Sequence, residues 1–100
     1  MEELGKTLFN IGVPEKALKE FKMLSVLDGK VGRYYYYQAN CYLVLKDFVE
    51  AEKLYTKAIE MDIQPDFLFE TYNNRAYVRY AQGDLIGAEE DKIQAKKLKR

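Results

Sequence analysis

The stretch YYYYQANCYLVLKDFVEAEKLYTKAIEMD, residues 34–62, decides the fold of this chain. Tyr35, Ala39 and Tyr42 follow one another at steps of four and three residues, so they share one stripe of a helix. Asp47 interrupts this pattern, and a glutamate three residues later gives it the spacing of a capping box, which marks a helix start. The stretch therefore predicts two amphipathic helices joined by a short turn.

Similar interruptions divide the whole chain into six segments of about 11 to 17 residues, an ordinary helix length. Pro14 suits the first turn of a helix, where its missing N–H has no intrahelical partner. Asp66 and Asp84 are placed to accept N–H bonds at helix starts. The breaks lie at residues 12–14, 28–30, 46–47, 63–66 and 82–84. We therefore expect an all-α fold with six helices and no strand.

Small residues recur at nearly constant intervals along the chain. Ala17 and Ala51 are 34 residues apart, whereas Ala51 and Ala88 are 37 apart, as are Ala39 and Ala76. A 34-residue unit explains these spacings if three extra residues lie in the break around residues 63–68. The predicted unit is a pair of helices, and stacked pairs bury a shared core.

The expected organisation is a single domain, residues 1–100, with repeats at 1–31, 32–68 and 69–100. Close helix crossings leave no room for large side chains, so Gly5, Ala39 and Ala76 are expected contact points within the pairs. The residues expected to be buried are Tyr35, Ala39, Tyr42, Ala51, Tyr55, Ala58 and Ala76.

The composition excludes several classes of protein. Lys+Arg and Asp+Glu both count 16, so there is no basic excess of the kind that nucleic-acid binding needs. With no His and one Cys, the chain cannot build a His-based triad or a Cys/His zinc site, so we expect no enzyme, no metal and no cofactor. No apolar run approaches the roughly 20 residues that span a bilayer, which predicts a cytoplasmic protein without membrane contact.

The repeated pattern resembles the tetratricopeptide repeat, a helix pair of 34 residues with small and aromatic residues at fixed places. The middle unit matches at Tyr35, Ala39, Tyr42, Phe48, Ala51, Tyr55 and Ala58. The resemblance implies three stacked antiparallel helix pairs that form a right-handed α-solenoid. Arg79 and Lys92 depart from the family's apolar pattern, and we interpret them as the polar outer face of an end cap.

The resemblance implies that the first helix of each pair lines a concave groove. Aromatic rings supply contact area there, and asparagine amides supply hydrogen bonds to peptide backbone, so a peptide or helix of a partner protein is the expected ligand. The alternative is that these tyrosines merely tolerate exposure. The expected groove residues are Phe9, Arg33, Tyr36, Tyr37, Asn40, Asn73, Asn74, Tyr77 and Tyr80.

Some members of the family hold the C-terminal carboxylate of chaperones with a clamp of Lys, Asn and Arg side chains. Here Glu2 and Glu70 occupy clamp cation positions, and only Lys6 and Arg33 offer compensating charge. We therefore expect acidic C-terminal peptides to bind weakly, and neutral or basic peptides with apolar anchors to bind better.

Two other features receive structural interpretations. Cys41 lies beside the predicted core stripe with no cationic neighbour, which is typical of a structural thiol. Consecutive helical residues diverge, so Glu89, Glu90 and Asp91 are expected to form a solvated face and not a metal site. The alternative function is a structural or self-assembling repeat unit, either part of a longer superhelix or a homo-oligomer through uncovered end faces.

Overall fold

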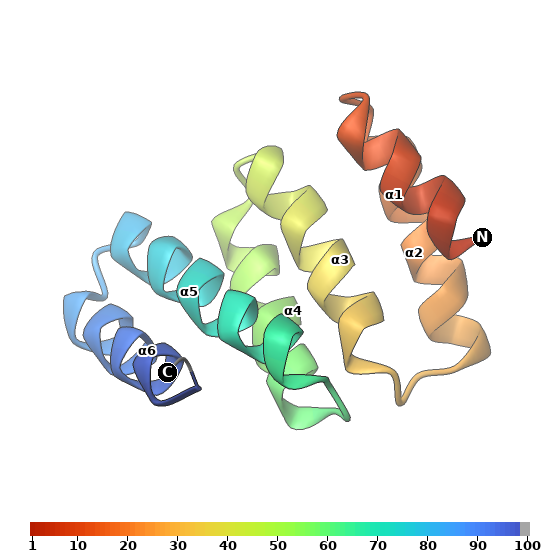
Figure 1. Ribbon diagram of the computed structural model, residues 1–100. Coiled ribbons are helices and arrows are strands. Elements are labelled where there is room, and N and C mark those ends of the chain that lie inside the picture. The colour runs from red at the N-terminus through yellow and green to blue at the C-terminus, as the bar shows by residue number, and fades with distance from the viewer. Residues whose placement is uncertain (99–100) are drawn as a thin grey trace.

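The computed structural model describes residues 1–98, so the last two residues of the expected third repeat lie outside it. Over these residues the chain forms six α-helices and one isolated bridge between Val31 and Asp62, which confirms the all-α expectation. No helix among them is long and apolar enough to cross a membrane. The helices are α1 (Glu2–Asn10), α2 (Pro14–Leu27), α3 (Gly32–Val44), α4 (Phe48–Glu60), α5 (Pro65–Ala81) and α6 (Leu85–Leu98) (Figure 1).

Local signals fix most helix starts. Asp47 accepts the N–H of Glu50 at 3.3 Å and caps α4, and the Asp84 carboxylate accepts the N–H of Gly87 at 2.9 Å at the start of α6. Pro14 is the first residue of α2, as predicted. The prediction for Asp66 is wrong, because α5 begins at Pro65, and Asp66 therefore lies within the first helical turn.

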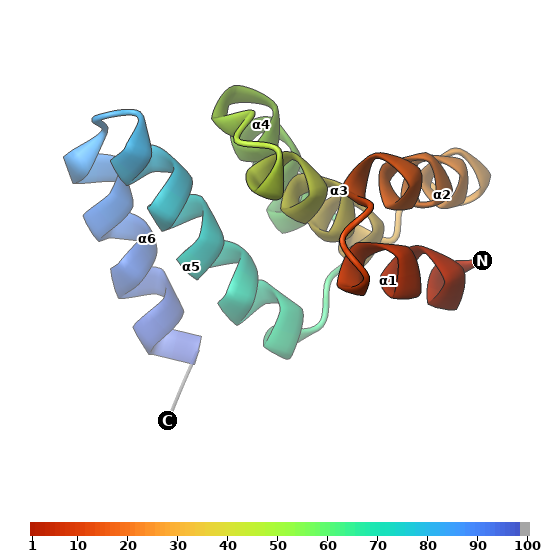
Figure 2. The same ribbon diagram turned by 90° about the horizontal axis from the view of Figure 1, so that it is seen from above.

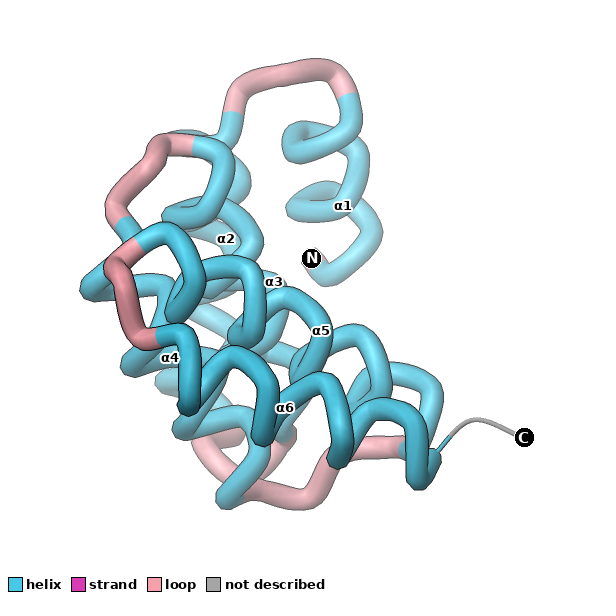
Figure 3. Tube along the Cα trace, turned by 90° about the vertical axis from the view of Figure 1, so that its left-hand side faces the viewer, coloured by secondary structure: helices cyan, strands magenta, loops and turns pink. Residues whose placement is uncertain are grey.

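The helices stack in chain order. Each helix packs on the next one along the chain, and α3 also contacts α5 directly. The connections are short and lie at the ends of the helices (Figure 3). The first helices of the three pairs, α1, α3 and α5, form one layer. In this layer α3 is set back between α1 and α5, which both extend beyond it on the same side, towards the bottom of the view (Figure 2). This arrangement gives the stack a concave face.

The three extra residues predicted for the break around residues 63–68 lengthen a helix instead of a loop. Eleven residues of α5 precede Ala76, whereas seven residues of α3 precede the equivalent Ala39. The difference is about one helical turn. Phe67 lies on this extra turn, for which α3 has no counterpart.

Most of the predicted core is confirmed, because Ala39, Ala51, Tyr55, Ala58 and Ala76 are buried. The predicted crossing at Gly5 is also close, since an added Cβ would lie 2.6 Å from the ring of Phe21. Ala39 and Tyr55 pack with Val78 of the next pair, so the core is continuous between repeats.

The prediction that Tyr35 and Tyr42 are buried is wrong, because both are half-buried. The Tyr35 hydroxyl donates to the Gly29 carbonyl at 2.8 Å, and Lys22 lies 5.7 Å from the centre of the Tyr42 ring. Helix α3 packs against helices on both sides, so its buried surface is wider than one stripe and includes Tyr37, Gln38 and Cys41. Both tyrosines lie at the edge of that surface.

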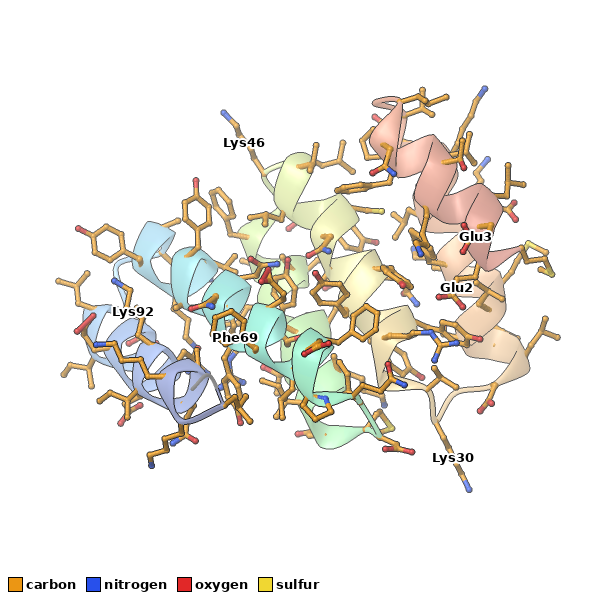
Figure 4. The ribbon with its side chains drawn as sticks, viewed as in Figure 1. Glu2, Glu3, Lys30, Lys46, Phe69 and Lys92 are labelled. Carbon is orange, nitrogen blue, oxygen red and sulfur yellow. The ribbon has the colours of Figure 1, made fainter. Side chains whose placement is uncertain are left out.

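The third pair contains a buried ion network, which corrects two predictions. Asp91 is 1% exposed and accepts hydrogen bonds from both Arg75 and Arg79, so it is not part of a solvated face. Arg79 also donates to Glu52 of α4 at 3.1 Å and therefore lies between helices and not on an outer surface. Lys92 is exposed, as an end cap requires (Figure 4).

Candidate functional site

The concave face contains a pocket of about 270 Å³. Side chains from α1, α2, α3 and α5 line it, so it forms only when the stack is assembled. Aromatic rings dominate the wall, and two asparagines and one lysine add polar groups. The lining residues are Lys6, Phe9, Asn10, Phe21, Tyr36, Tyr37, Asn40 and Phe67. Four of the predicted groove residues, Phe9, Tyr36, Tyr37 and Asn40, are therefore brought together.

Phe67 joins the extra turn of α5 to the tyrosines of α3. Its ring centre lies 5.5 Å from that of Tyr36 and 5.9 Å from that of Tyr37, with the rings edge to face in both cases. These distances lie in the favourable range for aromatic pairs. Phe67 was not among the predicted groove residues, although the 37-residue spacing already placed an insertion at this point of the chain.

Tyr37 lies at the base of the pocket and not on a solvent-facing surface, which corrects the expectation for it. It is 9% exposed, and its ring stacks on Phe21 with centres 4.7 Å apart. Its hydroxyl donates to Glu2 of α1 at 3.1 Å. Burial, followed by the neighbouring Glu2 carboxylate, raises the pKa of Tyr37, so the hydroxyl stays protonated at neutral pH.

The charges of Glu2 and Arg33 compensate each other. The Arg33 guanidinium donates to both carboxylate oxygens of Glu2, at 3.0 and 3.1 Å, in a two-pronged pair that joins α3 to α1. This hydrogen bonding is the largest cause that lowers the pKa of Glu2. Lys6 lies 3.5 Å from Glu3 in a second ion pair. The Glu2 carboxylate and the Arg33 guanidinium therefore neutralise each other between α1 and α3.

Asn40 of α3 forms hydrogen bonds with side chains of both α4 and α5. Its side-chain oxygen accepts from the Tyr55 hydroxyl and from the Asn74 amide, the latter at 3.1 Å. Asn74 is thereby tied to α3 and lies beside the pocket. Burial raises the pKa of Tyr36, and a hydrogen bond with Asn40 opposes this shift.

The remaining predicted groove residues lie further along α5. Tyr77 is 60% exposed, and its ring packs edge to face on Phe48, with centres 6.3 Å apart. Tyr80 is 63% exposed, and Asn73 is half-buried. None of the three lines the aromatic pocket, so the predicted groove divides into a pocket and an exposed tyrosine extension.

A second pocket, of about 430 Å³, lies between the α2–α3 and α4–α5 connections. Phe67 lines this pocket as well as the first one, so its side chain stands between the two. The other lining residues are Asp28, Lys30, Val31, Arg33, Asp62, Ile63 and Gln64. Arg33, predicted for the groove, belongs to this second pocket and not to the aromatic one.

The cysteine and the acidic side chains are candidate reactive or metal-binding groups, and their burial and spacing bear on both roles. Burial raises the pKa of Cys41 to about 12, so its thiol is protonated at neutral pH, in agreement with a structural interpretation. Within residues 1–98, no three His, Cys, Asp or Glu side chains gather closely enough to hold a metal ion.

Comparison with known proteins identifies the repeat. The sequence model of the tetratricopeptide repeat matches residues 32–64, which span the α3–α4 pair. A search of curated proteins found no match. Together with its likeness to solved helical-repeat structures, this match shows that the chain belongs to the tetratricopeptide repeat family.

Three solved structures illustrate the similarity. PcrH in complex with the chaperone binding region of PopD is 30% identical, with a TM-score of 0.85 over 96% of this chain and 70% of that one. The type III secretion chaperone SycD of Yersinia enterocolitica, in complex with a peptide of the translocator YopD, is 26% identical with a TM-score of 0.87, over 98% of this chain and 72% of that one. MamA is 24% identical with a TM-score of 0.87, over 97% of this chain. The chain spans 55% of the length of MamA.

Proposed function

We propose that this chain is a protein-binding module that holds a peptide or helical segment of a partner protein against its concave face. The observation that carries the proposal is the aromatic pocket of about 270 Å³ built from α1, α2, α3 and α5. Partly exposed rings beside amide groups offer contact area and backbone hydrogen bonds together. PcrH and SycD, which share the fold, are described in complexes with segments of partner proteins.

The proposal includes the repeat boundaries 1–31, 32–68 and 69–100, a cytoplasmic location, and a role without catalysis, nucleic acid or membrane. The clustered charges of the third pair support a structural role for these groups, because Arg75 and Arg79 donate to Asp91. Acid–base catalysis needs titratable groups positioned towards a substrate, whereas these groups bind one another.

A capture experiment with matched variants tests the binding role. The wild-type chain, Tyr36→Ala and Val26→Ala are used as baits in an extract of the source cell. Tyr36 lines the pocket, whereas Val26 is 83% exposed on α2, away from it. The proposal expects a partner that is captured by wild type and Val26→Ala and lost with Tyr36→Ala. Equal capture by all three baits would contradict it.

A second candidate is self-association, favoured by an exposed apolar patch on α2. Met23, Val26 and Leu27 are 50%, 83% and 73% exposed, and together they line a shallow apolar hollow. Exposed apolar surface of this kind marks contact sites in many proteins. A concentration series by light scattering separates the candidates, because a groove binder stays monomeric at concentrations where a self-associating unit does not.

A further inference from the structure

We propose that Phe67 determines the specificity of the concave face, by closing the aromatic pocket so that it takes one aliphatic or single-ring anchor, with a basic residue of the same peptide beyond it. This inference rests on the proposed binding function and deepens it. Three features of the molecule support it: the position of Phe67, the size of the pocket that Phe67 closes, and the carboxylates beyond Phe67 that form no ion pair within residues 1–98.

Phe67 forms a partition between two hollows. Its ring packs edge to face on Tyr36 and Tyr37 on the side of the aromatic pocket. The same side chain lines the second pocket, beside Val31 and Ile63. Replacing the ring by a methyl group would therefore connect the two hollows into one longer channel.

The size of the aromatic pocket limits its occupant. At about 270 Å³ it falls below the range of about 300–1,000 Å³ typical of small-molecule sites. A dry cavity of about 150 Å³ is enough for a benzene ring. The pocket thus suits one Leu, Ile, Met or Phe side chain together with part of the adjoining backbone, for which Asn10 and Asn40 offer amide groups.

The unpaired charges beyond Phe67 favour a basic group. Among residues 1–98, Arg33 and Lys6 are engaged by Glu2 and Glu3, as described above, whereas Asp28 and Asp62 form no ion pair. Lys30 lines the second pocket, but its ammonium group points away from the helices (Figure 4). A peptide Lys or Arg that crosses Phe67 would lay its stem on the ring and meet two carboxylates.

The test is a selection of short random peptides displayed on phage, with the intact chain as bait. Wild type, Phe67→Ala, Phe67→Trp and Phe48→Ala are compared, each after circular dichroism confirms its helical fold. Phe48→Ala is the matched control, because it removes an equal ring that packs on Tyr77 and lines neither pocket. Wild type should enrich one aliphatic or phenyl anchor with a Lys or Arg close to it.

Phe67→Ala should raise the frequency of Trp relative to Leu at the anchor position by about tenfold, the discrimination expected from apolar pocket size. Phe67→Trp should move the preference the other way, towards smaller anchors, and Phe48→Ala should not change it. Enriched peptides whose anchors stay the same in both Phe67 variants, or whose flanks are acidic, would overturn the inference while leaving peptide binding intact. Failure of the wild-type chain to enrich any peptide would overturn the proposed function itself.

Discussion

Asp91 of α6 receives Arg75 of α5 in a two-pronged ion pair, with N–O distances of 2.7 and 2.9 Å, although only 1% of Asp91 is exposed. Arg79 donates to the same carboxylate at 3.2 Å and links it to Glu52 of α4. This shared buried carboxylate therefore attaches α6 to α5 and, through Arg79, connects it to α4.

The variant Asp91→Ala tests this network. It leaves the Arg75 and Arg79 charges without their buried partner, so we expect a loss of about 3–5 kcal/mol in the free energy of unfolding. Urea denaturation at neutral pH measures it. The control is Glu89→Ala, which breaks only the exposed pair with Lys92 and should change stability by less than about 1 kcal/mol. Similar losses for the two variants would show that the buried network contributes no more to stability than an exposed ion pair.

The crossing of α1 and α2 depends on the absence of a side chain at Gly5. In Gly5→Ala, the new Cβ would meet the Phe21 ring at 2.6 Å, and overpacking should cost about 1–3 kcal/mol. Thermal unfolding followed by circular dichroism measures the loss. Thr7→Ala, on an exposed part of the same helix, is the comparison variant. A melting temperature of Gly5→Ala at or above that of the wild type would refute the close crossing.

The Glu2–Arg33 pair predicts a specific pH dependence. Arg33 lowers the folded-state pKa of Glu2 below its ordinary 4.5, so the stabilisation is present above pH 4.5 and disappears as the pH falls through the lowered pKa. The free energy of unfolding of Glu2→Gln should therefore be lower than that of the wild type by about 1 kcal/mol at pH 7. This difference should shrink as the pH falls. Urea denaturation of both proteins between pH 7 and pH 2.5 checks this, and a gap that widens in acid would have the wrong sign.

The tyrosines of the groove and of the helix interface should respond differently to truncation. Tyr77→Ala removes an exposed ring and should weaken binding of a selected peptide by about 1–3 kcal/mol if the ligand extends along α5. Tyr42→Ala removes a ring that packs on the central core and should instead lower the free energy of unfolding by about 1–2 kcal/mol. Calorimetric titration measures the change in binding, and urea denaturation measures the change in stability. If both variants lose the same stability and Tyr77→Ala binds the peptide as well as the wild type, Tyr77 does not contact the ligand.

The fold was predictable because periodic spacing of small and apolar residues reports helix pairs directly. Ala39 and Ala76 mark equivalent crossings, and both are buried. The spacing of 37 residues also revealed the insertion, but not that it continues a helix from Pro65. Phe67 was missed for that reason, since its contacts with α3 depend on the path of this extra turn.

The charged residues were harder to predict. Asp91 lies three residues after Ala88 and four before Ala95, both buried, so it shares their stripe despite its polar neighbours in sequence. Its partners Arg75 and Arg79 lie one turn apart on a different helix. Pairing of this kind is a tertiary relationship, and the pattern of one helix does not specify it.

An amide NMR titration of the isotope-labelled chain with the most strongly enriched peptide locates the binding surface directly. We predict that the largest chemical-shift changes fall on Phe9, Tyr36, Asn40 and Phe67, around the aromatic pocket of the concave face. Changes concentrated instead on Met23, Val26 and Leu27 would place the ligand on the apolar patch of α2 and show that the concave face is not the binding site.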